Sequence, residues 1–208
     1  PVLTANPEPY ADFFDVVLLG DGENLLNDFF NAYKEVRNVD REKKLKALAQ
    51  VPGIYAPSLY EVEYKSLDDA IKSIKPISSD IPLEVKKQTY RGNTLSASTV
   101  VTEKAAWENI FMVEVVRSCP EMCRFCLASY LTLPFRTASL NDSLIPAIEK
   151  GLQVTNRLGL LGASVTQHPE FNTLLDYINR PKYEDIRLSI ASVRTNTVTE
   201  ELAKTLAQ

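Results

Sequence analysis

The chain has 208 residues, of which 45% are hydrophobic and 24% are charged, and this composition excludes a wholly disordered protein. Its 23 basic and 27 acidic side chains give a net charge of -4. The chain therefore lacks the overall positive field that holds nucleic acid or an anionic membrane. The first residues lack the pattern of a signal peptide, and no apolar run reaches the roughly 18 residues needed to span a bilayer. We therefore expect a cytoplasmic protein.

The first predicted elements are a strand, a glycine turn and a helix. Residues 15–19 form a compact apolar strand that ends at Gly20-Asp-Gly-Glu23. Apolar residues at helical spacing follow over residues 25–36 and predict an amphipathic helix. The glycine turn lacks the GxGxxG fingerprint, so this unit does not predict a dinucleotide site.

The next segment, residues 63–105, predicts a connection between domains. It carries scattered Lys, Ser and Pro and lacks a sustained helical pattern. Within it, we expect Glu84–Tyr90 and Leu95–Thr102 to pair as a hairpin around Arg91-Gly-Asn93.

Strand and helix patterns alternate three times after residue 106. The predicted strands are Ile110–Val116, Leu158–Val165 and Ile186–Val193. Helices are predicted to begin near Asp142 or Ser143, near Glu170, and at a capping box over Thr197–Glu200. Alternation of this kind predicts an α/β fold with parallel strands, whose carboxyl ends gather the chemistry.

The three cysteines of the chain lie between Cys119 and Cys126, directly after the first of these strands. An odd number excludes a closed disulfide framework, and the C-x3-C-x2-C spacing indicates metal binding. Zinc requires four ligands in a structural site, and the chain offers only His168, far downstream. An iron-sulfur cluster in an electron carrier takes four cysteines. Three cysteines therefore predict a cluster with one iron left open, and we expect the loop to be poorly ordered without iron.

Two alternatives remain at this point. One is a zinc-stabilised binding module held by the three cysteines and His168, and the other is an iron-sulfur electron-transfer protein. In the preferred interpretation, His168 is not a ligand and has a structural role near the end of the second strand.

The spacing of Cys119, Cys123 and Cys126 resembles the CxxxCxxC signature of the radical S-adenosylmethionine (radical SAM) enzymes. The resemblance implies a partial (β/α) barrel of about three βα units and a [4Fe-4S] cluster on these cysteines. It implies that S-adenosylmethionine binds the open iron and is cleaved reductively to a 5'-deoxyadenosyl radical. It further implies an electron donor such as a flavodoxin or ferredoxin, and a substrate that the sequence does not identify. The residues expected to contact S-adenosylmethionine are Phe125, Gly162, Ala163, Ser192 and Arg194.

Residues 1–62 resemble the C-terminal end of the Rossmann-like cobalamin-binding domain that precedes the catalytic domain in many radical SAM proteins. The resemblance rests on Thr4–Glu8, residues 15–17, Gly20–Glu23 and Val51–Pro57. It implies cobalamin-dependent methyl transfer as one possible reaction. The residues that this resemblance implies for cobalamin binding are Thr4, Asn6, Glu8, Gly20, Gly22 and Glu23.

The chain is thus divided into a cobalamin-domain end (1–62), a connection (63–105) and the N-terminal half of a radical SAM core domain (106–208). Because three βα units are about half of such a barrel, we expect a piece of a longer enzyme that is inactive by itself. The sequence gives no indication of a membrane or nucleic-acid partner.

Overall fold

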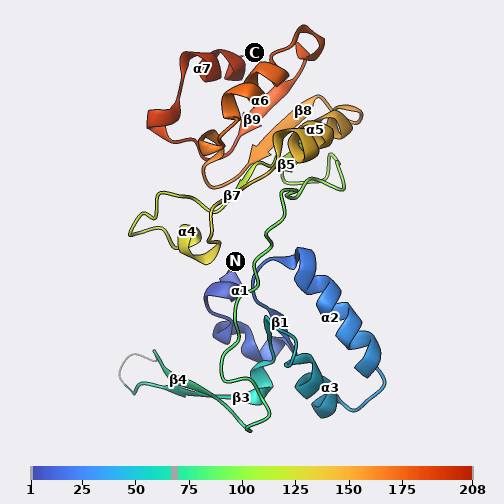
Figure 1. Cartoon of the computed structure of the whole chain (residues 1–208), viewed down its shortest axis with the longest axis vertical. Coiled ribbons are helices and arrows are strands. Elements are labelled where there is room, and N and C mark those ends of the chain that lie inside the picture. Colours follow the sequence, from blue (N-terminus) through green and yellow to red (C-terminus); the bar gives the residue numbers. More distant parts are fainter. Residues whose placement is uncertain (1, 67–69, 208) are drawn as a thin grey trace. The chain divides into compact units, whose positions relative to one another are not determined.

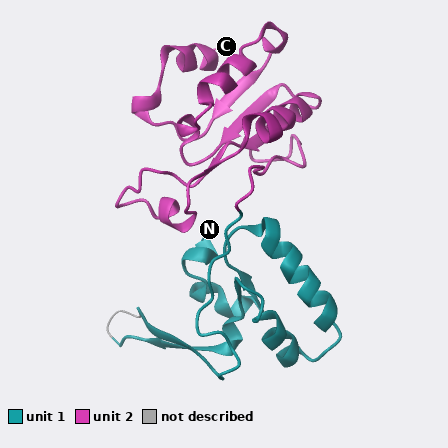
Figure 2. Ribbon diagram, in the orientation of Figure 1, with its two compact units in different colours: residues 1–90 teal, residues 91–208 magenta. Residues whose placement is uncertain are grey.

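The computed structural model describes residues 2–66 and 70–207. It divides the chain into two compact units, Pro1–Tyr90 and Arg91–Gln208 (Figure 2). The boundary falls within the segment 63–105, so part of that segment builds the first unit and part the second. In the part of the chain that the structure describes, no helix has the length and apolar character needed to cross a membrane.

The first unit combines two small antiparallel sheets with short helices (Figure 1). In the first sheet, β1 pairs with β2, so that Val17 lies opposite Tyr55 and Leu18 opposite Ile54. In the second sheet, β3 pairs with β4, from Tyr60 opposite Pro76 to Tyr64 opposite Ile71. The elements of this unit are α1 (Val2–Ala5), a 3-10 helix (Glu8–Phe13), β1 (Val17–Leu18), α2 (Gly22–Val36), α3 (Arg41–Leu48), β2 (Ile54–Tyr55), a 3-10 helix (Pro57–Leu59), β3 (Tyr60–Tyr64) and β4 (Ile71–Pro76).

The predicted strand, glycine turn and helix are present, although the strand is shorter than expected. Leu25 of α2 is buried with Leu48 and Ile54 in one apolar cluster. Other apolar residues of α2, among them Leu26 and Phe30, are exposed. Burial of one stripe of α2 against α3 and β2 therefore fixes this helix, as its amphipathic pattern predicts.

The segment that sequence analysis treats as a connection pairs differently from the prediction. Gln88 forms a parallel bridge with Gly20, and its backbone N donates to the Leu19 carbonyl at 2.9 Å. Gly20 has φ of +115°, and a Cβ there would lie 2.0 Å from the Gln88 carbonyl oxygen. The predicted hairpin of residues 84–90 with 95–102 is therefore wrong. The strand-like stretch around Gln88 packs on the glycine turn instead, because only glycine permits this approach.

The second unit contains a parallel sheet in the order β5-β8-β9. Strand β5 (Ile110–Glu114) pairs with β8 (Arg157–Leu161), and β8 pairs with β9 (Arg187–Ile190), both in parallel. Helices α5 (Ile145–Leu152), α6 (Phe171–Ile178) and α7 (Glu200–Leu206) follow the successive strands (Figure 1). The predicted α/β class with parallel strands is confirmed. The partial (β/α) barrel and the end of a cobalamin-binding domain remain predictions.

Several element ends differ from their predicted positions. The first predicted strand divides, because β5 ends at Glu114 and the chain then turns into β6 (Val116–Arg117), which pairs antiparallel with β7 (Arg136–Thr137). The second and third strands stop earlier than predicted, at Leu161 and Ile190. The observed helix caps also differ from the predicted ones. Ser139 caps the π-helical turn Leu140–Leu144 that leads into α5, and Thr199 caps α7.

The remaining edge of β5 is partly covered by the chain before it. Ala97 bridges Val113 in antiparallel orientation, and the backbone N of Glu114 donates to the Ser96 carbonyl at 2.8 Å. This pairing satisfies backbone groups that an exposed edge leaves open. It also explains why Leu95–Thr102 does not serve as an arm of the predicted hairpin.

The two faces of the parallel sheet differ. Phe111 and Val113 of β5 are buried, and α5 packs against β5 and β8. The opposite face carries a hollow of about 270 Å³. Its lining includes Trp107, Ile110, Met112, Gly159, Leu161 and Ala191. Helices therefore cover one side of this sheet, and an apolar surface remains on the other.

Candidate functional site

The cysteine loop, residues 118–135, lies at the carboxyl end of the first parallel strand. The β6–β7 ladder joins the two ends of the loop, and α4 (Leu127–Leu131) lies within it (Figure 1). Cys119, Cys123 and Cys126 are half-buried free thiols. The structure thus places the three predicted ligands on one short loop beside the strand ends, the region where chemistry gathers in parallel α/β folds.

Cys126, the third cysteine, accepts a hydrogen bond from a neighbouring serine. The Ser129 hydroxyl donates to Cys126 Sγ at 3.5 Å, and the Ser118 hydroxyl donates to the Ser129 carbonyl at 2.9 Å. The Ser129 hydroxyl, followed by the Ser129 backbone, lowers the pKa of the Cys126 thiol below its ordinary value. A hydrogen-bonded thiol of this kind is predisposed to the thiolate form that binds metal.

The donor set fits an iron-sulfur cluster by its chemistry, since it consists of three free thiols on one loop. Among residues 2–66 and 70–207, however, no three His, Cys, Asp or Glu side chains are grouped closely enough to hold a metal ion. A cluster bound to all three sulfur atoms would require them to lie closer together than they do in this structure.

Glu121, for which the sequence predicts no role, lies between the first two cysteines. Its Oε1 accepts a hydrogen bond from Gln167 Nε2 at 2.5 Å, and its Oε2 lies 3.3 Å from the Arg194 guanidinium. Gln167 follows β8 and Arg194 follows β9, so Glu121 joins the cysteine loop to the ends of both neighbouring strands. The sequence does contain a signal for this contact, namely a carboxylate inside the cysteine motif and an arginine after the third strand.

The residues predicted to contact S-adenosylmethionine lie at the same edge in different settings. The Phe125 ring is 92% exposed, whereas Arg194 pairs with Glu121 and with Asn196. A Cβ at Gly162 would lie 2.8 Å from the Val116 carbonyl oxygen, which indicates a packing role for this glycine. Ala163 and Ser192 are exposed. These five assignments remain predictions.

Unusual backbone conformations gather at this edge. Three non-glycine residues have positive φ here, namely Ser118 (71°), Met122 (48°) and Ser192 (55°). Such conformations cost about 1–3 kcal/mol each for residues with a side chain, and they cluster at functional sites. Ser118 directly precedes Cys119 and Met122 directly precedes Cys123, so the path of the cysteine loop is locally strained.

His168 is buried, with 4% of its surface exposed. Its Nδ1 accepts a hydrogen bond from the Glu170 backbone N at 3.0 Å, so the proton of the neutral ring resides on Nε2, which donates to the Ala138 carbonyl at 2.7 Å. Both ring nitrogens are engaged with the backbone. This geometry agrees with a structural role and leaves no lone pair for zinc.

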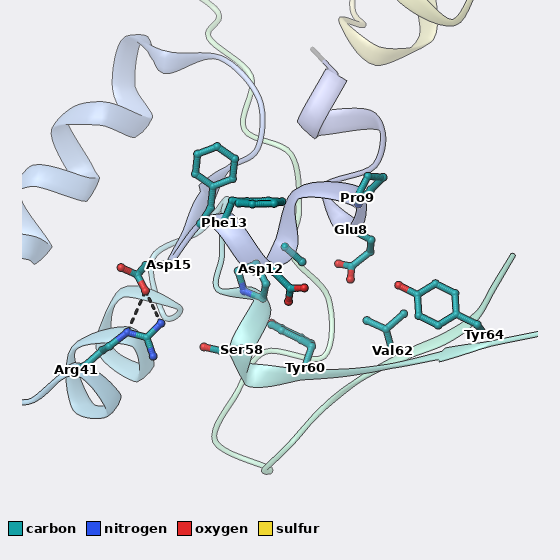
Figure 3. A pocket seen from close by; sticks show the side chains of 13 residues that line it. Glu8, Pro9, Asp12, Phe13, Asp15, Arg41, Ser58, Tyr60, Val62 and Tyr64 are labelled. Carbon is teal, nitrogen blue, oxygen red and sulfur yellow. Dashed lines mark hydrogen bonds and ion pairs between the residues drawn. The ribbon is translucent and has the colours of Figure 1, made fainter. Parts of the chain in front are cut away.

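The first unit contains a pocket of about 590 Å³, which Figure 3 shows from close by. Glu8 and Asp12 project from the first 3-10 helix toward the side chains of β3, and Asp15 pairs with Arg41 at one end (Figure 3). The Tyr55 hydroxyl donates to Glu8 Oε1 at 2.5 Å. Burial, and then the Glu8 carboxylate, raises the pKa of Tyr55 above its ordinary value.

The residues predicted for cobalamin occupy two places in this unit. Thr4 lies in α1, and Asn6 Oδ1 accepts a hydrogen bond from the Glu8 backbone N at 3.1 Å. Glu8 itself lines the pocket. The other three residues, Gly20, Gly22 and Glu23, form the turn and the start of α2 beside Gln88. Of the six, Glu8 lines the pocket, and the glycine turn supports the packing of the chain.

Comparisons with known proteins bear on the first unit and on the whole chain. Residues 1–57 match the family model described as radical SAM proteins, N-terminal. An uncharacterized protein of Methanocaldococcus jannaschii is 27% identical over 208 residues, which cover 99% of this chain and 39% of that relative. The chain therefore spans about two fifths of the length of the curated relative it matches. No solved structure matches the chain. The N-terminal match, independent of the cysteine motif, supports a protein related to the radical SAM superfamily.

Proposed function

We propose that the chain is part of a radical SAM enzyme in which Cys119, Cys123 and Cys126 hold a [4Fe-4S] cluster. The observation that carries the proposal is the placement of three free thiols on one loop at the carboxyl end of β5. The family match to residues 1–57 supports it from a part of the chain that contains no cysteine. When bound, the cluster would supply one electron for reductive cleavage of S-adenosylmethionine and leave one iron for that ligand.

The residues of this chain would supply binding and orientation. The three thiolates hold the cluster, and the Ser129 hydroxyl favours the ionised form of Cys126. Phe125 presents an exposed ring to an adenine, while Gly162, Ala163 and Ser192 line the edge formed by the next two strands. The apolar hollow on the open face of the same sheet provides a surface from which water is readily displaced.

The identity of the partners is a narrower part of the proposal. A flavodoxin or ferredoxin would deliver the electron, and cobalamin would bind at residues of the first unit, including Glu8. Equilibrium dialysis of the chain against hydroxocobalamin tests the second point, because bound cobalamin accumulates on the protein side and is measured by its visible absorption. Equal concentrations on both sides of the membrane, with protein at millimolar concentration, would remove cobalamin from the proposal.

Anaerobic reconstitution with iron and sulfide tests the cluster directly. We expect about four irons and four sulfides per chain, with zinc absent. Single Ala substitutions at Cys119, Cys123 and Cys126 should each lower the iron content. They should also weaken the visible absorption that arises from sulfur-to-iron charge transfer in the cluster. Arg124→Ala, at an exposed position inside the same loop, is the matched control and should retain iron.

Two results would contradict the proposal. Full and stable cluster formation in Cys123→Ala would show that this thiol is not a ligand. Stoichiometric zinc in protein purified without added metal, lost on substitution of His168, would favour the zinc-stabilised module instead.

A further inference from the structure

The cysteine loop is held by contacts that require no metal. The sequence predicts a loop with little to pack against, yet the Tyr130 hydroxyl donates to the Met122 carbonyl at 2.8 Å and Glu121 uses both carboxylate oxygens. Met122, between these contacts, adopts φ of 48°. A strained residue persists when its surroundings fix it. The contacts on either side of Met122 supply that constraint.

The two partners of Glu121 belong to a connected surface. The Thr166 and Thr197 hydroxyl oxygens lie 2.5 Å apart and join the turn after β8 to the turn after β9. The Thr197 hydroxyl also donates to the Arg194 carbonyl at 2.8 Å. Gln167 and Arg194 are therefore presented by two turns that are tied to each other. A carboxylate that binds both is fixed in direction as well as in distance.

The ion pair between Glu121 and Arg194 is only partly exposed to solvent. The Arg194 and Glu121 side chains are 35% and 32% exposed, so water screens their attraction only in part. Gln167 Oε1 is buried and has no hydrogen-bond partner in the described structure. Loss of Glu121 would also leave Gln167 Nε2 without its acceptor in the protein, so that the Gln167 side chain would retain neither of these contacts.

We propose that Glu121 is a positioning residue that clasps the cysteine loop to the ends of β8 and β9 before the cluster binds. This inference rests on the proposed function, since the clasp anchors at the strand ends a loop whose three thiols still have to draw together around the cluster. In this arrangement Arg194 acts through Glu121, and its guanidinium orients the cysteine loop. The clasp comprises Glu121, Gln167 and Arg194.

The test measures cysteine accessibility in metal-free protein. Under native conditions, reaction of the three thiols with a maleimide reports opening of the loop. Glu121→Ala and Arg194→Ala should each accelerate the reaction roughly threefold to tenfold, the range expected when a partly exposed, charged hydrogen bond is lost. Glu103→Ala, an exposed carboxylate outside the loop, is the matched control and should leave the rate unchanged.

A charge exchange separates positioning from a general loss of stability. The double variant Glu121→Arg with Arg194→Glu restores an ion pair, and once the Gln167 amide flips, its Oε1 accepts a hydrogen bond from the new guanidinium. We expect thiol reactivity to return toward the wild-type rate. Urea unfolding of each variant confirms that the reaction is measured on folded protein. Unchanged reactivity in both single Ala variants, or no rescue in the double variant, would overturn the proposal.

Iron uptake distinguishes this proposal from the function on which it rests. After reconstitution, Glu121→Ala should lose iron to a chelator faster than wild type, with the control unchanged. If wild type binds iron but the variants match it in both thiol reactivity and iron release, the clasp is refuted and the cluster assignment stands. If thiol reactivity changes but wild type binds no iron, the link to a cluster is refuted.

Discussion

Replacement of His168 by Ala tests whether this residue is structural or metal-binding. The side chain is 4% exposed and makes two hydrogen bonds, from Nε2 to the Ala138 carbonyl and from the Glu170 backbone N to Nδ1. Each such bond contributes about 1 kcal/mol net, and removal of a buried ring adds a cavity term of similar size. We expect the free energy of unfolding to fall by about 2–4 kcal/mol.

Urea denaturation followed by far-UV circular dichroism measures this loss. Thr173→Ala, on the exposed side of α6 close to His168, is the control and should change stability by less than about 0.5 kcal/mol. In parallel, the iron content of reconstituted His168→Ala should equal that of wild type per folded chain. A stability change no larger than that of the control, or loss of metal from a variant that remains folded, would refute the structural assignment.

Three further predictions follow from individual contacts. Gly162→Ala should destabilise the metal-free chain by about 1–3 kcal/mol in urea, because the new Cβ meets the Val116 carbonyl at 2.8 Å; wild-type stability would contradict this packing. Thr199→Ala removes the cap that accepts from the Leu202 backbone N and should cost about 1 kcal/mol in the same assay. The Tyr177 and Tyr183 hydroxyls and Lys182 lower the pKa of Glu149 from 4.5 to about 2. The stabilising contribution of the Glu149 carboxylate is therefore complete above pH 4.5 and lost as the pH falls toward 2. Glu149→Gln should accordingly flatten the acid-unfolding profile across that window. An acid profile identical to that of wild type would show that the contacts of Glu149 with the two tyrosines and Lys182 are absent.

The amino-acid sequence by itself predicted the α/β class and the three cysteines of the candidate site. Alternating strand and helix patterns after residue 106 predicted parallel strands, because hydrophobic periodicity is a local property that survives in the folded chain. The cysteine spacing likewise placed three thiols on one loop, since eight residues cannot carry them far apart. The structural role of His168 followed from the poor fit of the chain to a zinc site.

Pairing between distant segments was decided only by the tertiary structure. No local pattern marks Gln88 as the neighbour of Gly20, and the partner of a short strand depends on which backbone edge is left open. For the same reason, the first predicted strand divides where Val116 turns to pair with Thr137. Glu121 is the clearest case at the site. Its carboxylate meets Gln167 and Arg194 only because parallel pairing brings the ends of three strands to one edge, and sequence separation conceals that proximity.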